Sequence, residues 1–413
     1  MRVNLSSLAF WELPEEEQEQ AFALLRREAP IAEMPPIEDD LAAIPQVNPT
    51  GYRAIVRYDD IKRISRDPQR FSSADGVVLG DVAPELLEAT LSFIAMDAPR
   101  HTKLRGLVSS AFTPRQVARI EEGIRQAAKE IVADAAPTGG GDFVTLIAKR
   151  LPLQTISDMI GVPDADRERI VAAADTIVSV GDEEFLGGRE PMAALGEAIF
   201  TLSQFASEMA AHREEHPSDD LMTALVQAEI DGERLTHAEI SAWFVLLSVA
   251  GNDTTRHTTS HAMRALTLHP DQREYIREDP DARLPAAVEE FVRWATPVMH
   301  FRRTVREPVE LHGETLRPGE KVVMFYLSGN RDDSAIEDPY RFDVTRDPNY
   351  HLGFGGGGPH YCLGASLART QLRSVFGEIL AQIPDIEVGE PNPLLGSFIR
   401  GVKRMDCSWR PRH

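Results

Sequence analysis

Cysteine is scarce in this sequence: Cys362 and Cys407 are the two cysteines among 413 residues. Two thiols so far apart do not form the disulfide framework of a secreted domain, and they fit a reducing compartment. The absence of clustered cysteines also excludes an iron–sulfur cluster bound by this chain. The sequence therefore predicts a cytoplasmic protein.

Long apolar runs are missing as well. The nearest to one is FVLLSVAG at 244–251, which is about half of the roughly 18 apolar residues that a membrane-spanning helix needs. The amino terminus, MRVNLSSLAFWELPEEEQEQ, lacks the basic stretch, apolar core and cleavage site of a signal peptide. We therefore expect a soluble protein with no membrane partner.

Basic residues are outnumbered by acidic ones, 44 against 65, which gives a formal net charge of −21. This excess of negative charge argues against nucleic acid as a partner. Glycine and proline are scattered, and no low-complexity stretch or repeat divides the chain. The hydrophobic fraction of 42% is that of an ordinary globular protein, so we expect one compact, monomeric domain over residues 1–413.

Most of the chain has the apolar spacing of helices, as in 114–135 and 189–216. Strand-like runs are few and short. They are YRAIVRY at 52–58, PVELHG at 308–313 and KVVMFYLS at 321–328. The sequence therefore predicts a mainly α fold with small β-sheets, in which the early and the late strands share one sheet.

The longest helix candidate covers residues 236–269. Thr236 and Glu239 match a capping box, and no proline follows before Pro270, so about 33 residues can form one helix of about 50 Å. The first half is apolar on nearly all sides, which indicates a helix buried through the middle of the molecule.

The second half of this helix contains Gly251, Asn252, Asp253, Thr254 and Thr255, all of them poor or mediocre helix formers. Two interpretations stay open here. Either the segment is a frayed part of the helix, or it is a kink that directs Asp253 and Thr254 toward a ligand.

The segment HLGFGGGGPHYCLGASLAR at 351–369 places a cysteine shortly after four glycines. Gly353, Gly355 and Gly358 match the spacing of a dinucleotide-binding turn, but no succession of strands and helices surrounds them. A second interpretation is a glycine-rich turn with a buried free thiol. The third is a metal–thiolate site, and Cys362 alone is enough for haem because the porphyrin supplies four ligands.

Haem makes further demands that the sequence meets. Its two propionates need cationic partners, and His101 and Arg105 lie four residues apart in MDAPRHTKLR. Asp253 and Thr254 offer an acid and an alcohol for handling dioxygen on the opposite side. The helix expected after Cys362 would present backbone N–H groups to the thiolate.

Together these stretches resemble the cytochrome P-450 family of haem-thiolate monooxygenases, from about residue 50 onward. Glu290 and Arg293 in EEFVRW match the family's Glu-x-x-Arg helix, and Arg346 falls where the family completes this pair. AGNDTT at 250–255 matches its oxygen-activating segment. Its cysteine loop is matched by Phe354, Gly358, His360, Cys362 and Gly364.

The resemblance implies a single-domain cytochrome P-450 fold around the long central helix, with heme b (iron protoporphyrin IX) as the cofactor. It implies that Cys362 ligates the iron, that Phe354 shields the sulfur, and that Asp253 and Thr254 deliver protons to dioxygen. By the same correspondence, the propionates are held by His101, Arg105, Arg303 and His360. The implied reaction is insertion of one oxygen atom into a C–H bond.

The loop departs from the family in one respect. Eight positions separate Phe354 from Cys362, one more than is usual in the family. Gly358, His360 and Gly364 keep their spacing to the cysteine, so the departure is one extra glycine, and the partner of each central glycine stays open. Cys407 falls in a late strand in this interpretation and is expected to be inert.

Electrons must come from outside, because no flavin or iron–sulfur motif is present. The resemblance points to a ferredoxin with its ferredoxin reductase, and Arg100, Lys103 and Arg115 are the candidates for contact with an acidic ferredoxin. A peroxide-driven haem enzyme or a haem sensor of the same fold is the alternative, which the pair of Asp253 and Thr254 disfavours. A binding module without haem is a third function.

The pocket implied by the family correspondence is almost wholly apolar. Its residues are Ile94, Leu246, Val249, Ala250, Val298, Met299, Phe398 and Ile399. Such walls bind hydrocarbon through burial, at about 25 cal/mol per Å². The motifs look most like those of bacterial members that hydroxylate steroids, terpenoids and methyl-branched lipids, so we expect a hydrophobic small-molecule substrate of this kind. A macrolide or peptide natural product is the alternative.

Overall fold

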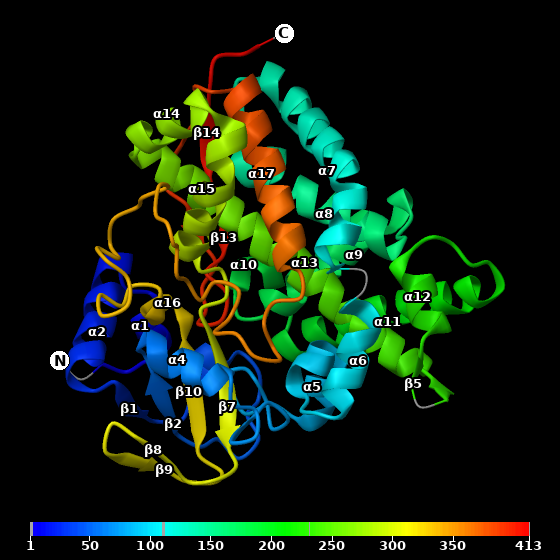
Figure 1. The fold of residues 1–413 in the computed structure, drawn as a ribbon. Coiled ribbons are helices and arrows are strands. Elements are labelled where there is room, and N and C mark those ends of the chain that lie inside the picture. Colours follow the sequence, from blue (N-terminus) through cyan, green and yellow to red (C-terminus); the bar gives the residue numbers. More distant parts are fainter. Residues whose placement is uncertain (1–2, 110–111, 231, 413) are drawn as a thin grey trace.

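The computed structural model describes residues 3–109, 112–230 and 232–412, and helices dominate it (Figure 1). The helices are α1 Leu8–Trp11, α2 Glu15–Glu28, α3 Asp39–Ala42, α4 Tyr58–Ser65, α5 Pro84–Leu91, α6 Arg100–Ser109, α7 Pro114–Ala135, α8 Arg150–Ile160, α9 Asp164–Val178, α10 Glu183–Leu186, α11 Pro191–Glu215, α12 Leu221–Gln227, α13 His237–Leu268, α14 Pro270–Glu278, α15 Pro280–Ala295, α16 Tyr326–Gly329 and α17 Ala365–Gln382. Turns of 3-10 helix cover Ser92–Ala95 and Ala136–Thr138, and a π-helical turn covers Val144–Ala148.

The strands are short. They are β1 Ile31–Met34, β2 Tyr52–Ile55, β3 Phe71–Ser72, β4 Gly140–Asp142, β5 Glu229–Ile230, β6 Glu233–Arg234, β7 His300–Val305, β8 Val309–Leu311, β9 Glu314–Leu316, β10 Lys321–Phe325, β11 Glu387–Val388, β12 Asn392–Pro393, β13 Val402–Arg404 and β14 Asp406–Ser408. The largest sheet has the strand order β1-β2-β10-β7-β3. It lies beside α2 and α4, near the amino terminus (Figure 1).

The main sheet joins segments that are distant in the sequence. β2 pairs in parallel with β10, with Val323 opposite Ala54, which confirms that an early and a late strand share a sheet. The run at 308–313 does not join them, because β8 and β9 form a hairpin of their own. The predicted strand is present as β8, and His312 and Gly313 turn the chain after it with φ values of 50° and 80°. Only its place in the shared sheet is predicted wrongly.

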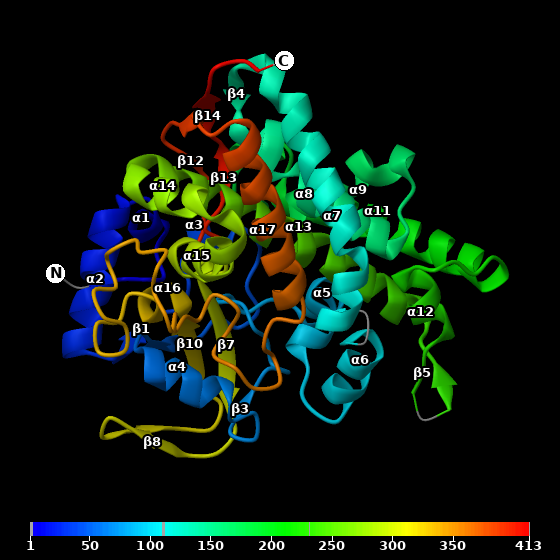
Figure 2. The same ribbon diagram turned by 45° about the horizontal axis from the view of Figure 1, so that its top comes forward.

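The central helix α13 begins at the predicted capping box, in which Thr236 and Glu239 exchange side-chain and backbone hydrogen bonds. It continues without a break to Leu268 and passes through the middle of the molecule in both views (Figures 1 and 2). A Cβ at Gly251 would lie 2.4 Å from Cδ1 of Ile156 on α8. The glycine therefore permits close packing of α8 on α13, and the helix is not frayed there.

The helices predicted at 114–135 and 189–216 are α7 and α11. α7 lies along α17, while α11 and α15 lie against α13. These contacts bury a continuous apolar cluster that includes Ile131, Trp243, Phe291 and Phe376. Within the described ranges, no helix has both the length and the apolar character that crossing a membrane would require.

The glycine-rich loop before α17 lies between α4 and α6 (Figure 2). A Cβ at Gly356 would lie 2.5 Å from Oγ of Ser65, and a Cβ at Gly358 would lie 2.3 Å from the carbonyl oxygen of Ser65. From α6, Arg105 donates a hydrogen bond of 2.5 Å to the carbonyl oxygen of Tyr361. These two glycines are thus required by the contact with α4, and the loop is held from both sides.

Candidate active site

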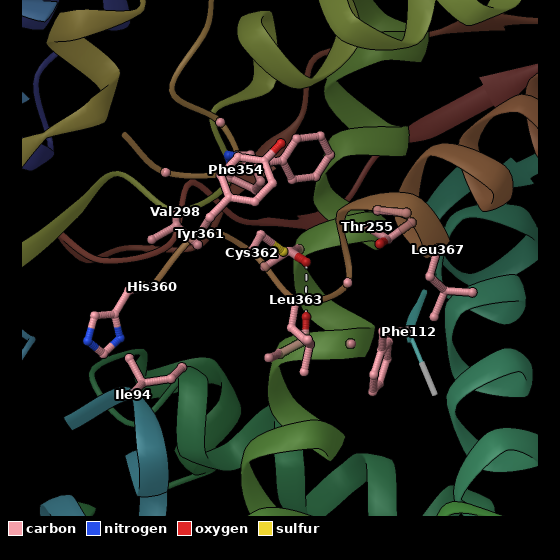
Figure 3. A pocket seen from close by; sticks show the side chains of 18 of the residues that line it. Ile94, Phe112, Thr255, Val298, Phe354, His360, Tyr361, Cys362, Leu363 and Leu367 are labelled. Atoms are coloured by element: carbon pink, nitrogen blue, oxygen red, sulfur yellow. Dashed lines mark hydrogen bonds between the residues drawn. The ribbon is translucent and has the colours of Figure 1, made fainter. Parts of the chain in front are cut away.

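Cys362 lines a cavity of about 220 Å³ between α13, β7 and the loop that leads into α17. Ile94 and His360 lie on one side of the cysteine, and Phe112 and Leu367 lie on the other side (Figure 3). Most of the wall is hydrocarbon, contributed by Phe93, Ile94, Leu246, Val298, Phe301 and Leu363 among others. The cavity therefore combines one thiol with an extensive apolar surface.

The thiol of Cys362 is exposed where it faces the cavity, while the protein packed around it raises its pKa by desolvation. The backbone N–H of Gly364 and the charges of Arg105 and Arg369 act in the opposite direction. α17 begins at Ala365, directly after Gly364. The helix predicted after the cysteine is present, and a backbone N–H at its start stabilises a thiolate.

Phe354 lies next to the cysteine in the structure, because the N–H of Cys362 donates to the carbonyl oxygen of Phe354 at 3.0 Å. The guanidinium carbon of Arg369 lies 4.4 Å from the centre of the Phe354 ring. Glu289 holds this guanidinium with two hydrogen bonds of 2.6 and 2.8 Å. Sequence reasoning missed Arg369 and Glu289, although Arg369 lies about two helical turns after Cys362.

Four nitrogen-bearing side chains gather beside the cavity, namely His101, Arg105, Arg303 and His360. The rings of His101 and His360 have their centres 4.1 Å apart. Burial and the neighbouring arginines lower the pKa of His101 to about 4 and the pKa of His360 to about 2. Burial also lowers the pKa of both arginines. This crowding of nitrogen donors would be relieved by an anionic ligand.

These features fit the haem that the sequence implies. Nε2 of buried His101 has no hydrogen-bond partner, so this donor is available to a propionate. Over the described ranges, no three or more histidine, cysteine, aspartate and glutamate side chains are grouped to hold a metal ion. Haem needs only one thiolate from the protein, and Cys362 lies where that thiolate would be required.

The predicted acid and alcohol lie in different environments. Thr254 lines the cavity, and its Oγ1 donates to the carbonyl oxygen of Ala250 at 3.0 Å. Asp253 is buried away from the cavity, with Oδ1 2.6 Å from Nη2 of Arg256. Nη1 of Arg256 lies 2.9 Å from Asp175 on α9. The structure therefore brings Thr254 to the cavity of Cys362 and places Asp253 in a charged chain that leads to α9.

Burial raises the pKa of Asp253 to about 7, against the opposing influence of Arg256. Repulsion from Asp175 adds to the increase. At neutral pH the carboxyl group of Asp253 is therefore protonated in part of the molecules, which is the condition for exchanging protons efficiently.

The predicted pocket residues divide between two cavities. Ile94, Leu246, Ala250 and Val298 line the first, whereas Leu246, Val249, Phe398 and Ile399 line a second cavity of about 240 Å³. Val298 of the first and Ile399 of the second form an isolated β-bridge. The two cavities therefore adjoin across Leu246 and this bridge.

Met299 is the predicted pocket residue that lines neither cavity. Its side chain is 4% exposed and belongs to a core cluster with Leu79, Val323 and Phe325. The side chains of neighbouring residues in extended backbone point to opposite faces. Val298 therefore points into the cavity, and Met299 points into the core. In contrast, His300 lines the second cavity, and sequence reasoning missed it.

The predicted Glu-x-x-Arg pair is fully buried on α15. Glu290 accepts hydrogen bonds of 2.7 and 2.6 Å from Arg293, and Arg346 lies 3.6 Å from Glu290. The same carboxylate accepts from the N–H of Asp343 and from Nδ2 of Asn349, both at 2.9 Å. This network fixes the segment that leads into the cysteine loop.

Cys407, the other thiol, lies in β14 as the sequence predicts. Its Sγ donates to the carbonyl oxygen of Gly141 at 3.2 Å, and burial raises the pKa of this thiol to about 12. A buried thiol that stays protonated at neutral pH is a poor nucleophile and a poor metal ligand. This is the environment expected for an inert cysteine.

Comparison with known proteins agrees with this geometry. The family model "Cytochrome P450" matches residues 189–383. The methyl-branched lipid omega-hydroxylase of Mycobacterium tuberculosis is 43% identical over 412 residues, which cover 98% of this chain and 94% of that protein. The steroid C26-monooxygenase of Mycolicibacterium smegmatis is 40% identical over 368 residues, which cover 87% of this chain and 84% of that protein.

Solved structures show the same relationship. Mycobacterium marinum cytochrome P450 CYP268A2 in complex with pseudoionone superposes with a TM-score of 0.95 at 52% identity, over 99% of this chain and 100% of that chain. Similarity of this extent covers the cysteine loop, the central helix and the main sheet together. The chain therefore belongs to the cytochrome P450 family of monooxygenases, whose cofactor is haem b.

Proposed function

We propose that this enzyme hydroxylates a C–H bond of a methyl-branched lipid, a terpenoid or a steroid. The observation that carries the proposal is the pair of adjoining, largely apolar cavities, of which one contains Cys362. Two cavities in a row suit an extended hydrocarbon substrate better than a compact polar one. The names of the relatives, a methyl-branched lipid omega-hydroxylase and a steroid C26-monooxygenase, support the same substrate classes.

Each group of side chains has a separate task in this proposal. Bound haem supplies the centre at which dioxygen is reduced and the C–H bond is oxidised. Cys362 would hold the iron as a thiolate, and His101, Arg105, Arg303 and His360 would hold the propionates. Ile94, Leu246 and Val298 exclude water and position the hydrocarbon by contact.

Thr254 and Asp253 act in succession on protons. The hydroxyl of Thr254, fixed by its hydrogen bond to Ala250, holds a proton at the cavity wall. Asp253 lies one residue away, and its two carboxylate oxygens have no partner of hydrogen-bond geometry despite the ion pair with Arg256. The partly protonated acid can resupply the hydroxyl when the carboxyl turns from Arg256 toward Thr254.

For electrons we propose a separate ferredoxin that docks near the cysteine loop. Of the residues predicted to contact the ferredoxin, Arg100 and Lys103 lie on α6, and Arg115 lies at the start of α7. The guanidinium of Arg100 lies 3.6 Å from Glu88 and 3.3 Å from Glu239. Arg66, which the sequence did not single out, donates to the carbonyl oxygen of Gly356 in the loop itself. A cation at this place is well situated to attract an acidic partner.

Stopped-flow reduction of the haem protein by a ferredoxin tests this docking. We expect Arg66→Glu to slow reduction by about tenfold at low salt and to weaken its dependence on salt. Arg27→Glu, at an exposed position on α2, is the matched control and should leave the rate unchanged. If the rate of reduction fell equally in both variants, or in neither of them, the cysteine loop would be excluded from the docking site.

A side-by-side titration tests the substrate class. The ligands are a methyl-branched fatty acid, a terpenoid, a sterol and a macrolide, and the readout is the spin-state change of the haem followed by product analysis. We expect spin shifts and hydroxylated products with the lipids. A shift and a product with the macrolide alone would overturn the lipid assignment.

A further inference from the structure

His300 is a buried polar side chain in the wall of an otherwise apolar cavity. The second cavity is lined mainly by hydrocarbon from four separated parts of the chain, 37–44, 78–91, 177–195 and 394–399. His300 stands at the start of β7 and is 0% exposed. Its ring lies 5.5 Å, centre to centre, from the rings of Phe325 and Phe398.

One ring nitrogen of His300 has a partner and the other has none. Nδ1 lies 3.0 Å from the carbonyl oxygen of Ser397, and because a carbonyl only accepts, Nδ1 must carry the proton. Nε2 has no hydrogen-bond partner. Burial lowers the pKa of His300 to about 4, so the ring is neutral at physiological pH. Nε2 therefore presents an unused lone pair, which is an acceptor.

Two other polar side chains on this wall, Gln46 and Thr90, are already engaged. Gln46 donates to the carbonyl oxygen of Ile44 and accepts from the N–H of Asp81. Thr90 donates to the carbonyl oxygen of Leu86. Among the described residues that line the second cavity, His300 is the one with a buried side-chain nitrogen or oxygen lacking a partner. A buried acceptor without a hydrogen bond lowers stability. A ligand that donates a hydrogen bond to Nε2 would therefore bind more tightly.

We propose that His300 Nε2 accepts a hydrogen bond from a hydroxyl group of the substrate, which fixes one end of the molecule in the second cavity while the rest reaches the cavity of Cys362. This inference rests on the proposed lipid hydroxylase function and narrows it. The preferred substrates are branched-lipid alcohols and hydroxysteroids. The corresponding ketones, ethers and esters lack the donor and bind more weakly.

The geometry of the cavities supports an anchor of this kind. Apolar walls bind hydrocarbon without fixing where along its length the molecule sits. A single hydrogen bond at the far end sets that position, and Leu246 lies on the wall of both cavities along the way. His300 is thus a specificity-determining residue, and it acts on binding and regioselectivity.

The test compares phytol with its methyl ether, which has the same branched chain but no hydroxyl donor. Dissociation constants are read from the spin-state change of the haem-loaded enzyme. We expect the wild type to bind phytol about tenfold more tightly than the ether. His300→Leu should bring this ratio to about one. His300→Gln should keep it, because a glutamine amide can donate to Ser397 and accept from the ligand.

Leu394→Ala is the matched control, since Leu394 lines the same cavity without a polar group. It should weaken both ligands and leave their ratio unchanged. A ratio near one in the wild type, or a ratio that survives in His300→Leu, would overturn the role of His300 and leave the lipid function standing. If neither ligand perturbs a correctly ligated haem in the wild type, the proposed function itself fails.

Discussion

The two cavities of this enzyme are built from different kinds of sequence. The wall around Cys362 comes largely from two short segments with recognisable spacing, the cysteine loop and the middle of α13. Apart from Leu246, Val249 and His300, the second cavity draws on four separated parts of the chain, none of which has a motif. The first cavity contains the groups proposed to hold and serve the cofactor, while the second is mainly hydrocarbon, and His300 carries the one buried side-chain nitrogen or oxygen without a partner among its described lining residues.

This difference has a physical cause. Holding haem and moving protons require fixed residue types at fixed distances, and local segments such as a loop and a helix turn can supply them. Choosing a hydrophobic substrate requires only volume and shape, which many combinations of apolar residues provide. We therefore expect changes in the first cavity to destroy chemistry and changes in the second to alter affinity.

The largest effect is expected at the thiolate. Replacing Cys362 by serine should abolish the red-shifted Soret band of the reduced, carbon-monoxide-bound protein, because this band reports a thiolate ligand. Cys407→Ser should keep the band, since Cys407 is buried in β14 and hydrogen-bonded to Gly141. An unchanged spectrum in Cys362→Ser would refute the assignment of the ligand.

The buried pair that supports the cysteine loop comes next. Glu290→Gln leaves the fully buried guanidinium of Arg293 without its counter-charge, which costs about 3–5 kcal/mol of the free energy of unfolding. Denaturant unfolding of the haem-loaded protein measures this loss. Glu274→Gln is the matched control, because Glu274 and Arg277 form an exposed ion pair with the same spacing on α14, and its unfolding curve should barely move. Similar curves for the two variants would contradict the role of burial.

Proton delivery should depend on pH through Asp253. Because its pKa is raised to about 7, the fraction that can donate falls as the pH rises through neutrality, and product formation should fall with it. Asp253→Asn should lower the rate by about 10²-fold and remove this dependence. Asp175→Asn should move the fall to lower pH, because the charge of Asp175 raises the pKa of Asp253.

Thr254→Ala should still bind substrate but divert electrons into peroxide or water, which is measured as product per electron consumed. Equal yields in Thr254→Ala and the wild type would exclude the hydroxyl from proton delivery. If Asp253→Asn and the wild type had the same pH profile, the carboxyl of Asp253 would be excluded from proton delivery.

The smallest effect is expected in the second cavity. Phe398→Ala removes apolar contact with the ligand, and we expect about 1.5 kcal/mol of weaker binding, roughly tenfold in Kd, for an extended lipid. The carbon-monoxide spectrum and the product yield per electron should stay at their wild-type values. Loss of the red-shifted Soret band in Phe398→Ala would contradict the view that the first cavity serves catalysis and the second serves substrate selection.

Sequence reasoning located the elements that have local causes. The capping box at Thr236 and Glu239 and the absence of proline before Pro270 were sufficient to predict α13. The strand β8 was predicted, but its pairing with β9 was missed, because the turn between them depends on positive φ values at His312 and Gly313, which the apolar pattern does not report. The strand β7 was missed because His300–Val305 is rich in polar and charged residues.

The site was less predictable where it depends on tertiary contacts. Thr254 reaches the cavity, but Asp253 lies about 100° further round the helix and meets Arg256 and Asp175 instead. The helical period could have shown, from the sequence alone, that Asp253 and Thr254 face different directions. His300 could not have been found in that way, because its role depends on a hydrogen bond to Ser397, 97 residues away.

Oxidation of a methyl-branched lipid alcohol under ¹⁸O₂ tests the central claim most directly. The haem-loaded enzyme receives electrons from a ferredoxin and its reductase, and the product is analysed by mass spectrometry. We predict a hydroxylated product that contains one ¹⁸O atom from dioxygen. A product whose new oxygen comes from water, or no lipid product while a macrolide is hydroxylated, would contradict the claim.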